Sequence, residues 1–290
     1  MKNIFKYISQ KELENIVGES VKTKDILTNV NSHTCIVNNK HIVKVPTNRR
    51  GAQSLCQEIH ISKVLHEYSV PVHTPEWRYV DLKQVNEISW LKGRAFCAVA
   101  PMINGEHPIT IDSSKLMGDL GRFFAILHKI PATSFGGVST YMDVEFKYMV
   151  DTWEGQKRHK GINTKRWLHF KRYLKGTVLQ RANELYVQNI RPVLTHADLH
   201  AGNILVDGNG RLCGILDFGN ALLTPEPQDV LIAERTILSG CAMLNAYQGY
   251  MGQRLDSQYK LQKTWSLSSK MNVRAEQMLS AFLKNERQRG

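Results

Sequence analysis

Three side chains that can take part in phosphoryl transfer lie within residues 196–219, which read HADLHAGNILVDGNGRLCGILDFG. They are Asp198, Asn203 and Asp217. Mg²⁺ carried by a nucleoside triphosphate takes one or two protein oxygens and keeps phosphate and water oxygens for its other positions, so an Asn and an Asp suffice as its protein ligands. A further carboxylate that does not bind the metal can accept the proton of an attacking hydroxyl.

The elements around these residues should bring them together. Residues 204–206 are apolar and typical of a strand, and residues 212–216 are typical of a returning strand. Residues 207–210, Asp-Gly-Asn-Gly, favour a turn because they accept positive φ and side-chain-to-backbone hydrogen bonds. Such a hairpin places Asn203 and Asp217 nearly opposite one another, with Asp198 on the loop before the first strand.

Two other interpretations of this segment lead away from catalysis. His196, Asp198 and His200 occupy alternate positions, the spacing that would place three metal ligands on one side of a strand. A zinc site needs a further cluster of ligands at suitable spacing, which the sequence lacks. A non-catalytic binding module would normally lack one of the three polar groups, and all three are present. The segment therefore favours an active enzyme.

The N-terminal part of the chain contains a lysine in a predicted strand and a glutamate in the helix predicted to follow it. Lys44 lies in a predicted strand, 42–45, where it is either an exposed residue or a phosphate ligand. A helix is predicted to follow, with Ser54 and Gln57 as a capping box at its start and Glu58 in its first turns. The sequence contains no Walker A or G-x-G-x-x-G motif.

Pattern and composition predict an α+β protein with two lobes. Strands near 35–37, 42–45, 76–80, 87–91 and 94–100 with one helix indicate an N-terminal lobe over residues 1–100. Residues 101–105, Pro-Met-Ile-Asn-Gly, break the pattern and form a predicted linker. Helices near 116–130, 142–158, 164–189 and 229–238 indicate a mainly helical lobe over residues 106–290.

Composition and charge restrict the compartment and the partners. The 290 residues contain no apolar run long enough for a membrane helix, and the N-terminus lacks a signal-peptide core, so we expect a cytoplasmic protein. The formal net charge is +12, and eight Lys and Arg residues crowd residues 157–175. That basic segment is either a solvated helix face or a binding surface for an anionic partner.

The central segment matches the pattern His-x-Asp-x-x-x-x-Asn followed by Asp-Phe-Gly, the protein-kinase arrangement of a catalytic base and two magnesium ligands. Most of the chain resembles the aminoglycoside phosphotransferase family of small-molecule kinases, and the stretch DGNGRLCGILDFG is similar to the branch with 2″-type enzymes. The other motifs behind this resemblance are Ile-Val-Lys-Val at 42–45, Glu58 in its helix, Leu-Gly-Arg-Phe-Phe-Ala-Ile-Leu-His at 120–128 and Pro-Gln-Asp-Val at 227–230.

The resemblance implies a protein-kinase-like two-lobe fold, with a small antiparallel sheet in the N-terminal lobe. It also implies Mg²⁺ as cofactor and ATP or GTP as phosphoryl donor. The residue roles that it implies are Asp198 as catalytic base, Asn203 and Asp217 as magnesium ligands, Lys44 as phosphate ligand paired with Glu58, the backbone from Pro101 to Ile103 as nucleotide hinge, and Asp229 as a brace of the catalytic loop.

The sequence indicates the reaction more clearly than it indicates the molecule that accepts the phosphoryl group. The resemblance implies an aminoglycoside or another antibiotic, whereas the Lys- and Arg-rich helices that should form the acceptor cleft favour a neutral or anionic alcohol, as in a metabolic kinase acting on a choline- or homoserine-like substrate. A protein kinase fits less well, because Ala197 replaces the arginine that pairs with a phosphorylated loop, and the gap from Gly219 to Thr224 is too short for an activation segment.

Overall fold

The structure is a computed structural model of the chain, and it describes residues 8–21, 23–28, 32–82, 95–138, 192–224 and 227–252. The chain divides into two compact units. The first contains nearly all of the described residues and comprises 1–138, 194–222 and 227–251. The second comprises 139–193, 223–226 and 252–290, most of which lie outside the described residues, as do the predicted strand at 87–91, the predicted helices at 142–158 and 164–189, and the basic segment.

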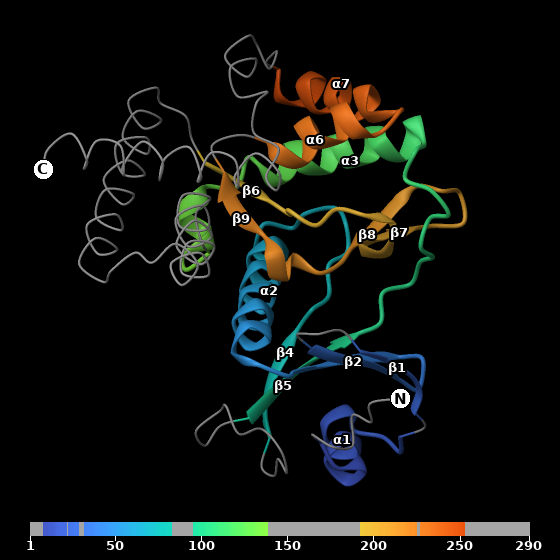
Figure 1. The fold of residues 1–290 in the computed structure, drawn as a ribbon, viewed down its shortest axis with the longest axis vertical. Helices are drawn as coiled ribbons and strands as arrows, with labels where there is room; N and C mark the ends of the chain where they lie inside the picture. The colour runs from blue at the N-terminus through green and yellow to red at the C-terminus, as the bar shows by residue number, and fades with distance from the viewer. Residues whose placement is uncertain are drawn as a thin grey trace, which may run out of the picture. The chain divides into compact units, whose positions relative to one another are not determined.

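A five-stranded antiparallel sheet forms the N-terminal part of the first unit (Figure 1). Its strands, in the spatial order β1-β2-β3-β5-β4, are β1 (Thr23–Thr28), β2 (Ser32–Val37), β3 (His41–Pro46), β5 (Ala95–Pro101) and β4 (Arg78–Leu82). Asn38 and Asn39 form the turn between β2 and β3, and both have a φ of 55°, a conformation that asparagine tolerates better than most residues. The strand expected at 76–80 begins two residues later, at Arg78.

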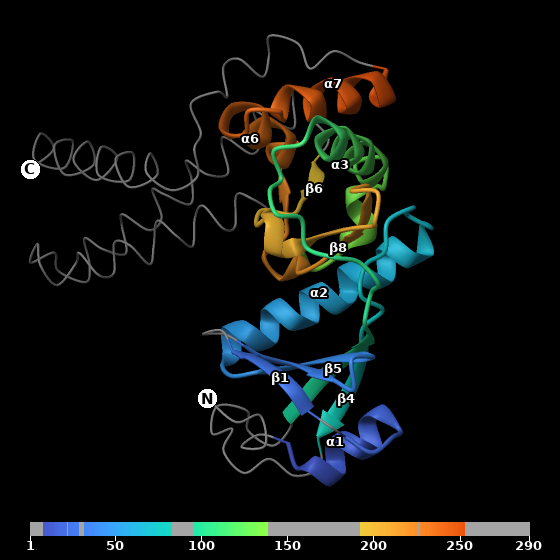
Figure 2. The same cartoon turned by 90° about the vertical axis from the view of Figure 1, so that its right-hand side faces the viewer.

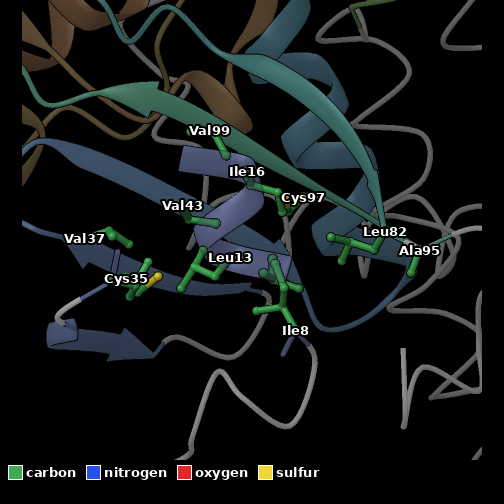
Figure 3. Packing of buried hydrophobic residues seen from close by; sticks show 12 residues of the cluster. Ile8, Leu13, Ile16, Cys35, Val37, Val43, Leu82, Ala95, Cys97 and Val99 are labelled. Carbon is green, nitrogen blue, oxygen red and sulfur yellow. The ribbon is translucent and has the colours of Figure 1, made fainter. Parts of the chain in front are cut away.

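Side chains alternate between the two faces of this sheet, and a helix covers each face (Figure 2). In β5, Cys97 and Val99 face α1 (Gln10–Val17), in a core shown in Figure 3, whereas Phe96 and Ala98 face α2 (Arg49–Glu67). The same alternation in β3 directs Val43 toward α1 and places Lys44 on the α2 side.

Helix α2 begins six residues earlier than the sequence predicts, since the predicted N-cap is Ser54. Its N-cap is Asn48, whose side-chain oxygen accepts the N–H of Gly51 at 2.8 Å. Ser54 and Gln57 therefore lie inside the helix, and the predicted capping box is wrong. The helix ends at Glu67, four residues before Pro71.

Helix α7 (Gly240–Met251) packs against both α3 (Ser114–Leu127) and α6 (Gln228–Thr236). The short 3₁₀ helix η2 (Ala132–Phe135) contacts α2 instead. A Cβ atom at Gly121 of α3 would overlap the carbonyl oxygen of Met243 in α7, so only glycine permits this close approach of the two helices.

At the end of α3, the buried imidazole of His128 forms hydrogen bonds with the Tyr247 hydroxyl and the Leu194 carbonyl, both at 2.9 Å. His128 therefore has a structural role, joining α3 to α7 and to β6 (Val193–Thr195). No described helix is both long and apolar enough to cross a lipid bilayer.

The predicted hairpin is present and is fixed to α3. Its strands are β7 (Ile204–Val206) and β8 (Leu212–Ile215), and the Asp207 side chain accepts the N–H groups of Asn209 and Arg211 in the turn. Buried Asp119 of α3 accepts two hydrogen bonds from Arg211, both at 2.7 Å. Short elements flank the hairpin: β6 (Val193–Thr195), η3 (Ala201–Asn203), η4 (Phe218–Asn220) and β9 (Leu222–Thr224).

Candidate active site

The hairpin brings Asn203 and Asp217 together as the sequence predicts. Ile204 pairs with Ile215, and the N–H of Leu216 donates to the carbonyl of Asn203 at 2.9 Å. Asp217 therefore follows directly after the residue opposite Asn203. The side-chain amide of Asn203 donates to the backbone carbonyl of Asp198 at 2.9 Å, which ties the loop carrying Asp198 to the base of the hairpin.

A buried carboxylate holds the start of this loop. Asp229, in the first turn of α6, accepts the backbone N–H groups of His196 at 2.6 Å and Ala197 at 3.1 Å. Burial raises the pKa of Asp229, and the two N–H groups act against that rise. Ala197 has a φ of 64°, a left-handed conformation that an alanine adopts only when its surroundings impose it.

Both ring nitrogens of buried His196 are occupied by backbone groups. Its Nδ1 accepts the N–H of Asp198 at 3.3 Å, so Nε2 carries the proton and donates to the carbonyl of Leu216 at 2.8 Å. His200 Nδ1 accepts the N–H of Gly202. Across the described part of the chain, no three His, Cys, Asp or Glu residues group as metal ligands.

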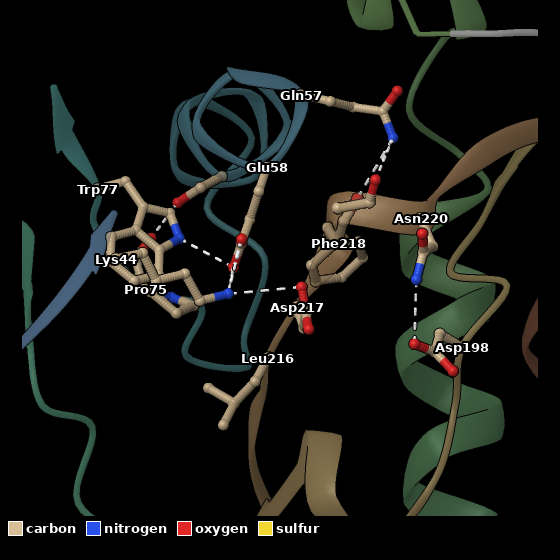
Figure 4. A network of polar contacts seen from close by, with 12 residues as sticks. Lys44, Gln57, Glu58, Pro75, Trp77, Asp198, Leu216, Asp217, Phe218 and Asn220 are labelled. Carbon is tan, nitrogen blue, oxygen red and sulfur yellow. Dashed lines mark hydrogen bonds and ion pairs between the residues drawn. The ribbon is translucent and has the colours of Figure 1, made fainter. Parts of the chain in front are cut away.

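Lys44 and Glu58 form the ion pair expected from the sequence (Figure 4). Lys44 Nζ lies 2.8 Å from Glu58 Oε2 and 3.4 Å from Asp217 Oδ1. Trp77 supports the pair, because its Nε1 donates to Glu58 Oε1 at 3.1 Å and Lys44 Nζ lies 5.2 Å from its ring centroid. Burial alone would lower the pKa of Lys44, but Glu58 and Asp217 outweigh it and the pKa is raised. The lysine is thus held as a cation beside Asp217.

Two further residues, Gln57 and Asn220, belong to this site, although the sequence suggests a capping role for Gln57 and no role for Asn220. Gln57 Nε2 reaches the carbonyls of Ala221 at 2.7 Å and Gly219 at 3.2 Å, so α2 is fixed to the segment after Asp217 (Figure 4). Asn220 Nδ2 donates to Asp198 Oδ2 at 3.1 Å. The only sequence signal for either residue is adjacency, since Gln57 precedes Glu58 and Asn220 follows the Asp-Phe-Gly motif.

The predicted hinge residues lie at the end of β5. The N–H of Met102 donates to the Lys40 carbonyl at 2.7 Å, whereas the N–H of Ile103 has no hydrogen-bond partner among the described residues. Pro101 and Ile103 line a cavity of about 280 Å³ together with His73, Thr74, Glu76, Met102 and Asn104. Neither Lys44 nor Asp217 is part of that lining.

The donor atoms present suit a magnesium ion. Because the Nδ2 of Asn203 is directed at the Asp198 carbonyl, its Oδ1 is left as a ligand atom. The side chain of Asp217 is 38% exposed and has a carboxylate oxygen that Lys44 does not contact. One amide oxygen and one carboxylate are hard oxygen ligands of the kind that Mg²⁺ binds when nucleotide phosphates fill its other positions.

Solved structures of phosphotransferases share this fold, and some of them are complexes with nucleotides or antibiotics. A streptomycin–ATP ternary complex of APH(2″)-IIa has a TM-score of 0.58 at 16% identity, covering 94% of both chains. A GDP complex of aminoglycoside 2′-phosphotransferase-IIIa has a TM-score of 0.53 at 19% identity, covering 92% of this chain and 93% of that one. The apoenzyme of macrolide 2′-phosphotransferase MphH from Brachybacterium faecium has a TM-score of 0.52 at 15% identity, covering 91% and 86%.

These similarities confirm the α+β, protein-kinase-like fold class. A comparison with curated proteins gave no significant match. The sequence does match the profile of the phosphotransferase enzyme family over residues 28–248, which is more than half of the chain and includes Lys44, the hairpin and Asp229. The arrangement of these residues and the extent of the match lead to one conclusion: the chain belongs to the phosphotransferase enzyme family.

Proposed function

We propose that this phosphotransferase moves the γ-phosphoryl group of ATP or GTP, in the presence of Mg²⁺, to a hydroxyl group of a small molecule. The observation that carries the proposal is the convergence of Lys44 and Asp217, 3.4 Å apart, at the end of the hairpin that also carries Asn203, next to the Asp198 loop. A phosphate-binding cation, two oxygen ligands and a separate carboxylate are the groups that phosphoryl transfer needs.

Each residue has a distinct role in this proposal. Lys44, held by Glu58, binds the α- and β-phosphates. Asp198 orients the acceptor hydroxyl and accepts its proton as the oxygen attacks the γ-phosphorus. The bond between the γ-phosphorus and the bridging oxygen breaks, and the nucleoside diphosphate leaves with its electron pair. Positioning and charge neutralisation account for most of the rate enhancement.

Asn203 and Asp217 would hold the magnesium ion. When bound, Mg²⁺ neutralises charge on the phosphate oxygens. The hinge would bind the base through the Ile103 N–H and the carbonyl groups of Pro101 and Met102, and it would separate a nucleotide-binding lobe, 1–100, from an acceptor-binding lobe, 106–290. An enzyme that consumes ATP or GTP acts where these nucleotides are plentiful, so we place it in the cytoplasm.

An aminoglycoside or another antibiotic is the first candidate acceptor, because structural neighbours are complexes with streptomycin and gentamicin or are macrolide phosphotransferases. A metabolic kinase acting on a neutral or anionic alcohol is the second candidate. The net charge of +12 favours the second, since a basic surface repels a polycationic acceptor. The basic segment 157–175 remains a candidate site for an anionic partner, to be tested by binding to nucleic acid or acidic vesicles at low salt.

The experiment that tests the proposal is a coupled assay of ADP or GDP release with Mg²⁺ across aminoglycosides, macrolides, choline, homoserine and simple sugars. We expect acceptor-dependent release with at least one of these compounds. Release with a cationic antibiotic would identify a resistance enzyme, and release with a small alcohol alone would identify a metabolic kinase. No acceptor-dependent release, with the nucleotide bound, would favour a non-catalytic module or a protein kinase, which a protein-acceptor assay separates.

A further inference from the structure

Asn220 forms a hydrogen bond with Asp198, the proposed base, although position 220 lies outside the motif that identifies the catalytic residues. Its Nδ2 donates to Asp198 Oδ2 at 3.1 Å (Figure 4). Within the described residues, this is the one hydrogen bond to the Asp198 carboxylate. The other hydrogen bonds of Asp198 involve its backbone. Its N–H donates to His196 Nδ1, and its carbonyl accepts from Asn203 Nδ2.

The backbone that carries Asn220 is fixed from several directions. The N–H of Ala221 donates to the Phe218 carbonyl at 3.0 Å and closes the 3₁₀ helix η4. Gln57 of α2 binds the carbonyls of Gly219 and Ala221, on both sides of Asn220. Phe218 is buried, and its ring centroid lies 4.7 Å from that of His196. The amide of Asn220 is therefore presented to Asp198 from a rigid support, although Asn220 itself is exposed.

We propose that Asn220 is a positioning residue that orients the Asp198 carboxylate for the acceptor hydroxyl. Donation to Oδ2 fixes the rotation of the carboxylate, so that Oδ1 is directed toward the acceptor with its lone pairs free. The side chain at position 220 must therefore be a neutral hydrogen-bond donor. This inference rests on the proposed function, because it assigns Asp198 the role of proton acceptor.

A pair of substitutions separates this role from a structural one. Asn220→Asp keeps the shape but replaces the donor with a second carboxylate about 3 Å from Asp198, where like charges repel. Asn220→Ala removes the donor without adding charge. If Asn220 only filled space, Asp would be tolerated better than Ala. If it positions Asp198, the aspartate variant is the more damaged of the two.

The test is steady-state phosphoryl transfer at saturating acceptor. We expect Asn220→Ala to lower kcat about 10- to 100-fold, the size expected for losing a hydrogen bond to a charged group, with the KM for nucleotide changed less than about 2-fold. Asn220→Asp should lower kcat further. The control is Asn209→Asp, which adds the same charge in the exposed turn at the far end of the hairpin and should leave kcat within about 2-fold of the unaltered protein.

The outcomes distinguish this inference from the proposed function. Equal kcat for the unaltered protein and both Asn220 variants, or a kcat for Asn220→Asp at or above that of Asn220→Ala, would overturn the positioning role while leaving the phosphotransferase activity in place. Loss of activity accompanied by an equal loss in the control or by a raised nucleotide KM alone would also contradict it. No transfer by the unaltered protein would overturn both.

Discussion

At the scale of single residues, the ion pair between Lys44 and Glu58 is the contact most sensitive to substitution. The side chains are 15% and 4% exposed, so removing one charge leaves the other buried without its partner. We expect Lys44→Met to destabilise the protein by about 3–5 kcal/mol and to raise the KM for nucleotide. The free energy of unfolding in urea measures the first effect and initial-rate kinetics measures the second.

The chain contains a matched control for this substitution. Lys63 and Glu67 form an exposed pair on α2 with 3.9 Å between their charged atoms. Lys63→Met removes the same chemical group from the surface and should change the free energy of unfolding by less than about 1 kcal/mol. Similar losses in both variants would show that the Lys44 pair is not a buried interaction.

His128 gives a pH dependence of stability. Burial lowers its pKa to about 3, from an ordinary value of 6.5, so the folded protein keeps the imidazole neutral where the unfolded chain protonates it. The contribution of neutral His128 to the free energy of unfolding is fully present above pH 6.5. It is lost as the pH falls toward about 3, by roughly 1.4 kcal/mol per pH unit at most. His128→Gln should flatten this slope in urea titrations between about pH 4 and pH 7. A slope unchanged by the substitution would assign the acid sensitivity to other groups.

Residue-level prediction succeeded where chemistry and local spacing coincide. Lys44 and Glu58 are predicted as a pair because the kinase-like motif implies a strand lysine held by a helix glutamate, and the structure joins them in an ion pair at 2.8 Å. Gln57 and Asn220 could not be found, because their contacts join residues far apart in sequence and neither side chain is unusual for an exposed position.

At the scale of elements, α3 supports the site by packing on α7 and by anchoring the hairpin through Asp119. A Cβ at Gly121 would overlap a backbone carbonyl of α7, which cannot move aside as a side chain can. We expect Gly121→Ala to destabilise the protein by about 1–3 kcal/mol and to lower its Tm.

A second glycine on the same helix is the control. A Cβ at Gly118 would meet no atom within 4 Å. Gly118→Ala should therefore stabilise α3 by about 0.5–1 kcal/mol, because alanine favours the helix. If the two substitutions had the same effect on Tm, the contact between α3 and α7 would tolerate a side chain at position 121.

The elements most accurately predicted are those that local sequence determines. The β7–β8 hairpin follows from a turn signal between two apolar runs. The start of α2 was misplaced because Asn48 and the Ser54–Gln57 pair offer competing N-terminal signals, and the structure uses Asn48. Helix α2 packs on η4 at Gly219, where an added Cβ would meet the side-chain oxygen of Ser54, and such long-range contacts leave no local pattern in the sequence.

At the scale of the whole molecule, the net charge of +12 should influence the encounter with substrates. Nucleoside triphosphates are anionic, so screening of the protein's field by salt should weaken their capture. We expect the KM for nucleotide to rise several-fold between about 20 and 300 mM salt, while the KM for an uncharged acceptor stays nearly constant. A nucleotide KM independent of salt would show that the basic groups lie too far from the site to act.

The central claim is that the Asp198, Asn203 and Asp217 set transfers a phosphoryl group to an acceptor, and γ-³²P-labelled ATP or GTP tests it most directly. The measurement follows the label into the acceptor, which separates transfer from hydrolysis. We predict labelled acceptor with the unaltered protein and about 10²- to 10⁴-fold less with Asp198→Ala at unchanged nucleotide affinity. Equal labelling by the Asp198→Ala variant, or label released only as inorganic phosphate by both proteins, would contradict the claim.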